Sequence, residues 1–348
     1  MKIALMTAWN TDDGASVHSQ ILAQAWAGMS HKVTVFSFVR DDFAPERFTG
    51  KDERFVIRCF GARQRKFIDP RPILSTDFDI FLVQNLRMLP VDALYRIFPL
   101  IRERSRTVHV VHESELPGET WFYQFLWDRV VYFDRRQDFL KDIYPNAEFI
   151  PFPCTPPREG SQSGSRKKLR LPLHKKIIFV FCQREYQPYL RDLKEDLKKH
   201  AVLLLVLPPV YEMLEKEAPP PWMIVREEDA LSDQRFDDYL FASDAAIFHK
   251  FQSRYHRVVS SVIFQVIGAG CPIFVPKQSD FFHPLQDEVV YYKDVEGLNK
   301  GLSELLLHNE DRRKRLTDAA KVFAAMNSAE KIARIYIESF TNVLKEGR

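Results

Sequence analysis

Residues 254–276 read RYHRVVSSVIFQVIGAGCPIFVP, and this stretch decides the fold. Ser260 and Ser261 open an apolar segment of helical length, Gly-Ala-Gly ends it, and a β-branched run follows at once. A buried helix that passes through a glycine turn into an apolar strand is typical of an α/β protein with a parallel sheet. The polar groups at the start of this helix therefore need an explanation.

The two serines could mark an anion site. If they begin the helix, their hydroxyls and the unpaired first-turn amides converge where the helix dipole is positive, and a phosphate fits there. Arg254, His256 and Arg257 lie just upstream and could close around the same group. The alternative is that Ser260 is only a helix cap.

Working outward, apolar strands alternate with helices twice along the chain. The first series predicts strands over 2–9, 31–39, 79–85, 107–112 and 147–153, with a helix after residue 14 and another over 91–104. The second series predicts strands over 176–182, 201–209, 222–227, 244–250, 272–276 and 288–293, with helices over 187–200, 235–243, 258–270, 295–308 and 329–347.

A composition change separates the two series. Residues 155–172 (TPPREGSQSGSRKKLRLP) are rich in Pro, Ser, Gly and charge and indicate an interdomain linker. At 348 residues the chain is too long for one ordinary core. We therefore predict an α/β protein with two doubly wound Rossmann-like domains, 1–154 and 173–325, facing a cleft, and a C-terminal helix over 326–348 that packs back on the first domain.

Charge and cysteine content limit the kinds of partner and the cellular compartment that the sequence favours. A net charge of +3 does not demand nucleic acid, although the run GARQRKF (61–67) is basic enough to meet phosphate or anionic lipid, or else is a solvated loop. Four cysteines lie far apart in apolar surroundings, which favours buried thiols and the cytoplasm over disulfides or zinc. The start reaches polar residues too soon for a signal peptide, and no segment has the roughly 20 apolar residues of a membrane span.

The ordered motifs resemble the retaining GT-B glycosyltransferases of family 4. FASDAAIFH (241–249), VVSSVIFQVIGAGCPIFVP (258–276) and DEVVYYKDVEGLNKGLSELL (287–306) match, in order, the strand, helix, strand and helix of the family's nucleotide-sugar half. EFIPFP (148–153) and TVHVVHE (107–113) resemble its upstream strands, and DDGASVHSQ, residues 12–20, resembles its opening helix. The resemblance covers most of the chain and implies the GT-B fold.

The sequence also departs from that family. Two glutamates eight residues apart are common there, the second holding the donor ribose, and the corresponding positions here are Arg257 and Gln265. Members whose helix starts with Ser-Gly-Ser are closer, so the resemblance implies that Ser260 and Ser261 contact the donor diphosphate.

A second departure affects the loop after the first strand of the nucleotide-sugar half. The family's G-R-x-x-x-x-K-G appears as CQREYQPYLR (182–191). Arg184 matches the arginine as a phosphate clamp, Tyr189 stands at the lysine position, and Arg191 could substitute for that lysine. Arg184 could also be an ordinary surface arginine.

In the first domain, Gly14 ends an Asp-Asp-Gly turn, where a residue without Cβ allows a ligand close to the backbone. His112 ends a strand, and the family's matching histidine sits near the reacting sugar. Glu113 and Glu115 could orient His112 or the acceptor, or be solvated loop acids. His18, one turn into the first helix, is a weaker candidate.

No metal is implied. The motif DFD (77–79) precedes a strand, and the resemblance puts no metal there. The aromatic run 121–133 is interpreted as an ordinary core helix rather than an acceptor-facing wall.

Together these features predict a metal-independent, retaining hexosyltransferase of glycan biosynthesis without a cofactor. Its donor would be a nucleotide sugar and its acceptor a glycan or a lipid-linked group. A cytoplasmic location with peripheral contact at the inner membrane face would suit such an acceptor. The alternative is a non-catalytic glycosyltransferase-like protein that binds a nucleotide or a partner, because the glutamate pair and the lysine are missing. A dinucleotide-dependent Rossmann enzyme is disfavoured, since TAWNTDDGAS (7–16) lacks G-x-G-x-x-G.

Overall fold

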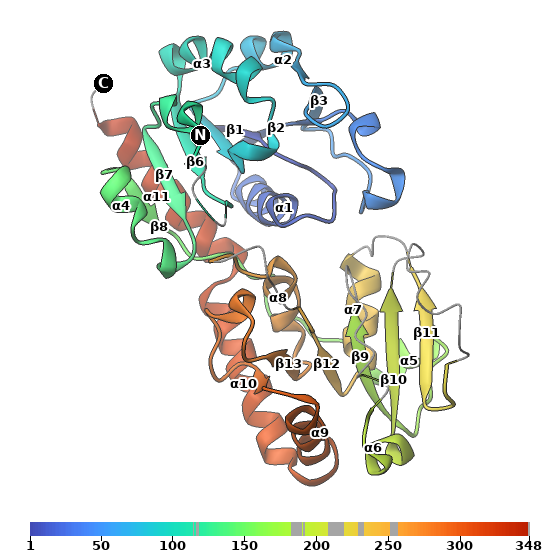
Figure 1. Cartoon of the computed structure of the whole chain (residues 1–348). Coiled ribbons are helices and arrows are strands. Elements are labelled where there is room, and N and C mark those ends of the chain that lie inside the picture. The colour runs from blue at the N-terminus through green and yellow to red at the C-terminus, as the bar shows by residue number, and fades with distance from the viewer. Residues whose placement is uncertain are drawn as a thin grey trace. The chain divides into compact units, whose positions relative to one another are not determined.

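The computed structural model describes residues 1–113, 115, 118–181, 190, 192–207, 219–228, 233–250 and 257–346 (Figure 1). The chain divides into two compact units. The first comprises Met1–Pro153, Tyr255–Ser261 and Asn327–Arg348, and the second comprises Cys154–Arg254 and Val262–Met326.

The first unit is built on a sheet with strand order β4-β3-β2-β1-β5-β6-β7-β8. Every pairing is parallel except that of β3 with β4, which form a short antiparallel hairpin. The strands are β1 (Lys2–Met6), β2 (Lys32–Phe38), β3 (Val56–Gly61), β4 (Phe67–Ile68), β5 (Ile80–Gln84), β6 (Arg106–Val110), β7 (Arg129–Tyr132) and β8 (Ala147–Phe149). The central strands are fully buried, because helices cover a parallel sheet on both faces.

Helices of the first unit come from both ends of the chain. They are α1 (Gly14–Gly28), α2 (Pro70–Ser75), α3 (Val91–Arg104), α4 (Leu140–Ile143) and α11 (Ala329–Lys345). The C-terminal helix α11 lies beside α1: the indole Nε1 of Trp26 donates to the carbonyl of Ala333 at 3.2 Å, and its ring meets Tyr336 edge-on at 5.8 Å. These apolar contacts fix the last helix to the unit that the first residues begin.

The second unit has an all-parallel sheet with strand order β11-β10-β9-β12-β13-β14. Its strands are β9 (Lys176–Phe181), β10 (Ala201–Leu207), β11 (Met223–Glu227), β12 (Ala245–Ile247), β13 (Ile273–Pro276) and β14 (Val290–Tyr292). Its helices are α5 (Gln162–Lys168), α6 (Glu195–His200), α7 (Asp233–Ala242), α8 (Ser261–Val266), α9 (Val295–Ser303) and α10 (Glu310–Met326). The predicted fold class, with two Rossmann-like parallel-sheet domains, is confirmed.

The glycine turn between α8 and β13 has a steric reason. Gly270 adopts φ +74°, the left-handed conformation that ends a helix cheaply only in glycine. A Cβ on Gly268 would lie 2.9 Å from the carbonyl oxygens of Thr155 and Pro156. The first and last residues of the Gly-Ala-Gly turn are thus needed for different purposes.

The secondary structure differs from the prediction in several places. Strands β3, β4 and β7 and the short helices α2 and α4 were not predicted. The core helix expected over 121–133 is wrong, because that run forms a 3-10 turn, Thr120–Gln124, and then β7. Its aromatic side chains are buried all the same, among them Phe122, Phe125 and Trp127. Burial alone does not distinguish a helix from a strand in a short apolar run.

The predicted linker also differs from the structure. Residues 155–172 lie within the second unit and contain α5, whose serine cap Ser161 accepts from the amide of Gly164 at 3.1 Å. Arg166 is buried and donates to the carboxylate of Asp244 at 2.6 Å. The charged residues that contributed to the interdomain-linker prediction therefore include Arg166, whose charge is neutralised by buried Asp244.

Candidate active site

The candidate site begins at the carboxyl edge of the first sheet. From β1 the chain moves outward to β2 and β3, and it later returns to place β5 on the other side of β1. The strand order therefore reverses between β1 and β5, and ligands of doubly wound sheets bind beyond the carboxyl ends at such a point. Gln84 ends β5, and His112 follows the end of β6.

Two histidines share one amide oxygen there. Oε1 of Gln84 lies 2.8 Å from Nδ1 of His18 and 2.7 Å from Nε2 of His112, and the two rings meet edge-on at 5.2 Å. Because an amide oxygen only accepts, both of these nitrogens carry hydrogen. Nδ1 of His112 is therefore the ring nitrogen with the lone pair.

Both rings are neutral at neutral pH. Burial lowers the pKa of His18 to about 4, partly offset by the bond to Gln84. Burial also lowers the pKa of His112 well below its ordinary value, and His18 and His109 add to that effect. Neutral His112 can accept a hydrogen bond or a proton through Nδ1 but cannot supply positive charge.

Gln84 is the residue that sequence reasoning missed. In the sequence, a polar residue at the end of an apolar strand is easily interpreted as the start of a loop. In a parallel sheet, that position lies at the carboxyl edge, where ligands bind. The histidine that we ranked lower, His18, lies in the same cluster as His112 and is fully buried.

Glu113 does not orient the His112 ring. Its carboxylate is buried and accepts from the backbone amides of Arg87, at 3.1 Å, and of His112, at 3.0 Å. Burial raises the pKa of Glu113, while those two amides lower it. The orienting bond proposed for Glu113 is instead made by Gln84, and Glu115 is exposed.

The predicted glycine turn and the serine pair are neighbours in the first unit. A Cβ built on Gly14, at the start of α1, would lie 3.4 Å from Oγ of Ser261. Ser261 is the first residue of α8, and Ser260 immediately before it is buried. The glycine turn predicted to admit a ligand and the serine pair predicted to bind an anion are thus adjacent.

Other predicted donor contacts have defined places. Arg257 is exposed, has φ +60°, and carries its guanidinium 5.0 Å above the ring of Phe139. Gln265 lies one turn after Ser261 on α8, and both are half-buried, which puts them on one face of that helix. Arg184, Arg191, Arg254 and His256 lie outside the described residues.

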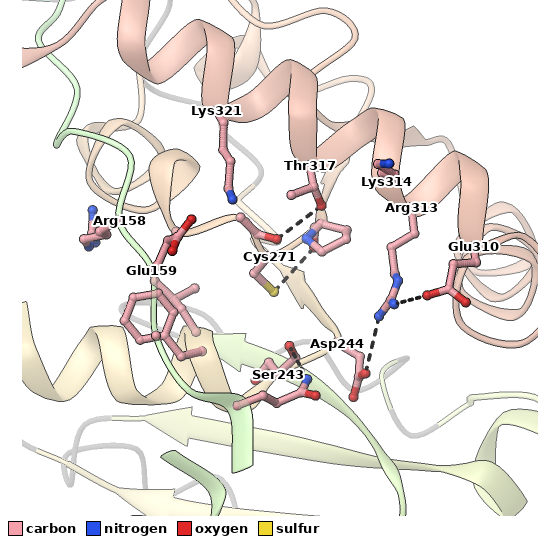
Figure 2. Close-up of a pocket in the computed structure, with 17 residues that line it drawn as sticks. Arg158, Glu159, Ser243, Asp244, Cys271, Glu310, Arg313, Lys314, Thr317 and Lys321 are labelled. Carbon is pink, nitrogen blue, oxygen red and sulfur yellow. Dashed lines mark hydrogen bonds and ion pairs between the residues drawn. The ribbon is translucent and has the colours of Figure 1, made fainter. Parts of the chain in front are cut away.

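The second unit has a cavity of about 510 Å³ near the start of α10 (Figure 2). Asp244 and Pro272, which line it, directly precede β12 and β13, so the cavity lies at the amino ends of these strands. Figure 2 shows Arg313 between Glu310 and Asp244, at 2.8 and 3.8 Å. Because ligands of such sheets bind at the opposite edge, we do not assign the donor to this cavity.

The described part of the chain contains neither a cluster of metal-ligating side chains nor a membrane-spanning helix. There, no group of three or more His, Cys, Asp or Glu side chains could hold a metal ion. Asp77 pairs with the side chain of Lys2, and Asp79 accepts from its backbone amide at 2.7 Å, so the DFD motif joins strand ends. Of the helices in these ranges, none has both the length and the apolar character needed to cross a bilayer.

Known structures share the fold of this chain, although no family model matches its sequence. Solved structures match over nearly the whole chain, and three of them illustrate the similarity. A glycosyltransferase from Rickettsia africae has 12% identity, a TM-score of 0.68 and 99% coverage of both chains.

Two further matches are similar in extent. Sucrose-phosphate synthase from Thermosynechococcus elongatus has 13% identity and a TM-score of 0.66, covering 98% of this chain and 100% of its own. HepE from Anabaena, solved in complex with UDP, has 12% identity, a TM-score of 0.66 and the same coverage. The chain therefore has the two-domain GT-B fold of these glycosyltransferases.

Proposed function

We propose that the chain is a glycosyltransferase that moves a hexosyl group from a nucleoside diphosphate sugar to an acceptor. The observation that carries the proposal is the full-length similarity to GT-B proteins, one of which is solved with UDP and with UDP-glucose. The cluster of His18, Gln84 and His112 at the switch point of the first sheet supports it.

In this proposal the serines hold the leaving group. Ser260, Ser261 and Arg184 stabilise the diphosphate as charge develops on it, with Arg257 assisting, and Gln265 contacts the donor ribose. Preorganised hydroxyls, amides and guanidinium groups can do this without a metal ion. Neutral His112 accepts a hydrogen bond from a sugar hydroxyl through Nδ1, and Glu113 positions its backbone. Retention of configuration, a cytoplasmic location and peripheral membrane contact belong to the same proposal.

A non-catalytic nucleotide-binding role is the second candidate. Arg257 and Gln265 stand where the resembling family often has glutamates, and Tyr189 stands where it has lysine. Both candidates predict binding of a nucleoside diphosphate, and only the first predicts sugar transfer or slow hydrolysis of the donor.

The test starts with a thermal-shift panel of UDP, GDP, ADP, NAD and S-adenosylmethionine, since a ligand that binds the native state raises the melting temperature. Calorimetry with the best nucleotide in EDTA should still show binding. Stabilisation by NAD alone, or binding that returns only with manganese, would overturn the proposal. Release of nucleoside diphosphate from a panel of nucleotide sugars then separates transferase from binding protein.

The serine pair is tested by the Ser260→Ala/Ser261→Ala double variant. Losing hydrogen bonds to a charged diphosphate should weaken nucleotide binding by about 10- to 150-fold, or about 1.5–3 kcal/mol. Ser161→Ala removes a helix-cap serine from α5 and is the matched control, since it should cost only stability. Unchanged affinity in the double variant, with a lower melting temperature, would leave the serines as a helix cap.

A further inference from the structure

A second cavity lies in the first unit, where α3 begins. Its volume is about 480 Å³, and its wall includes Lys66, Arg87, Arg96, Glu119 and Trp121. A cavity of this size accommodates a small organic ligand. None of these residues belongs to the donor contacts proposed above.

The three cations of this wall outnumber its acids. Arg87 has one acidic neighbour, since its guanidinium lies 3.7 Å from the carboxylate of Glu119. Asp92 is the other acid of the wall. Neither Lys66 nor Arg96 forms an ion pair with any residue in the described ranges. With three cations against two acids, the wall carries a net charge of +1, which favours an anionic ligand.

The backbone around the cations is held in place. The buried carboxylate of Asp42 accepts from the amides of Ala62, at 2.8 Å, Arg63, at 3.1 Å, and Gln64, at 2.9 Å, which fixes the turn that carries Lys66. Arg96 lies on α3, a helix of 14 residues. The cation positions are therefore set by folded elements, so binding costs little backbone entropy.

The start of α3 adds two donors. Its first residue follows Pro90, which provides no side-chain cap, and the amides of Ala93 and Leu94 bond to the Pro90 carbonyl at 3.1 and 3.0 Å. The amides of Val91 and Asp92, which line the cavity, donate to nothing in the described part of the chain. These groups supplement the cations as anion contacts.

The side chain of Glu113 forms hydrogen bonds both to the wall of this cavity and to a residue of the candidate active site. One carboxylate oxygen of Glu113 accepts from the amide of Arg87, in the cavity wall, and the other accepts from the amide of His112. The wall and the histidine are thus positioned by the same buried side chain, at the carboxyl ends of β5 and β6.

We propose that the cavity binds a phosphate group of the acceptor. The cations and free amides suit an anion with several oxygens, and Trp121 offers an aromatic face to the organic part of the ligand. This inference rests on the proposed function, whose acceptor it specifies as a phosphate ester. The ester can be free in solution or anchored in a lipid layer, because the cavity contacts only the shared phosphate chemistry.

The test uses the full chain, hexyl phosphate as the probe, and calorimetry at low salt. Lys66→Gln/Arg96→Gln should weaken hexyl phosphate binding by about tenfold or more while leaving UDP affinity unchanged, since charge-assisted contacts to the phosphate are lost. Lys314→Gln, from the cavity in the second unit, makes the same type of charge change and should alter neither affinity. Both cation positions of the double variant are exposed, and its melting temperature checks that it is folded.

The outcomes separate this inference from the proposed function. UDP binding together with hexyl phosphate affinity that is equal in parent and double variant would overturn the inference alone. Failure of the whole nucleotide panel would overturn the proposed function, whatever happens at the cavity. Vesicles of phosphatidylcholine with and without roughly 20% phosphatidic acid test whether the protein binds the phosphate group in a lipid layer. Binding to anionic vesicles with no response to hexyl phosphate would show surface attraction and overturn the cavity site.

Discussion

The two cavities have similar volumes, about 480 and 510 Å³, and each lies where a long helix begins. Each also has two cations without an ion pair in the ranges described, Lys66 and Arg96 in the first unit and Lys314 and Lys321 in the second. They differ in the backbone donors at the helix start. Oδ1 of Asn309 accepts from the amide of Arg312 at 2.9 Å and so caps α10, whereas Pro90 gives α3 no side-chain cap. The lining charges therefore rank the cavities alike, and the uncapped helix start favours the first as the anion site.

An ion-pair network in the second unit is centred on one buried carboxylate. Asp244 accepts from Arg166 at 2.6 Å and from the amide of Ile177 at 2.8 Å, and Lys176 lies 3.4 Å away. It joins α5, the start of β9 and the start of β12. These cations serve folding, whereas Lys314 and Lys321 of the same cavity form no ion pair with Asp244 in the ranges described.

The largest expected effect tests that role. Asp244→Asn keeps the shape but leaves the buried Arg166 without its counter-charge, so the unfolding free energy should fall by about 3–5 kcal/mol. Chemical denaturation measures it. Glu310→Gln makes the same change at an exposed partner of Arg313 and should cost less than about 1 kcal/mol. Equal losses in the two variants would remove the distinction between core and surface pairs.

Acid should act on the first unit through a neutral histidine. His109 on β6 is fully buried, and among the described residues neither ring nitrogen has a hydrogen-bond partner, although Oε2 of Glu113 lies 3.9 Å from Nε2. Burial lowers the pKa of His109 to about 3. The unfolded chain therefore binds this proton first as the pH falls below 6.5, and stability is lost between pH 6.5 and 3.

His109→Phe removes that titration. Between pH 7 and 4 the variant should lose about 3 kcal/mol less unfolding free energy than the parent. Denaturant unfolding at both pH values gives the comparison, and the difference between them cancels any packing change. The raised pKa of Glu113 acts in the opposite direction and is present in both proteins. Parallel pH profiles would show that His109 is protonated in the folded state as easily as in the unfolded one.

Gln84→Leu tests the shared acceptor of the candidate site. It leaves Nδ1 of His18 and Nε2 of His112 without their partner, and the unfolding free energy should fall by about 1–3 kcal/mol. Gln162→Leu, at an exposed residue of the other cavity whose amide lies 3.3 Å from the Ser243 carbonyl, is the control and should stay within about 0.5 kcal/mol. If Gln84→Leu is equally mild, the bonds to the two rings do not stabilise the site.

Most of the fold could be predicted from the sequence because the central strands are apolar throughout and alternate with helices of clear period. Strands β3, β4 and β7 could not. β3 follows a charged run, β4 has only two residues, and β7 lies inside an aromatic run, so none stands out from its neighbours. Arg166 misled the linker prediction, since no local pattern shows that Asp244 neutralises it.

Candidate site residues could be selected from the sequence only where a local motif existed. His112 and Gly14 stood out from their positions at a strand end and a turn. Gln84 depends on β5 lying beside β6, which is a matter of strand order. Lys66 and Arg96 line one cavity although 30 residues separate them, counted from their positions in the sequence. Contacts made by tertiary structure leave no periodic signal.

The smallest expected effect distinguishes the cavities most directly. Glu119→Gln removes a half-exposed acid next to Arg87, so hexyl phosphate should bind about two- to fivefold more tightly, the scale of one partly screened charge. Glu310→Gln removes an acid from the cavity of the second unit and should leave that affinity unchanged. Calorimetry at low and high salt measures both, and the gain in Glu119→Gln should shrink as salt rises. An equal gain in the two variants would mean that the probe responds to the net charge of the molecule, and the two cavities would then be equivalent.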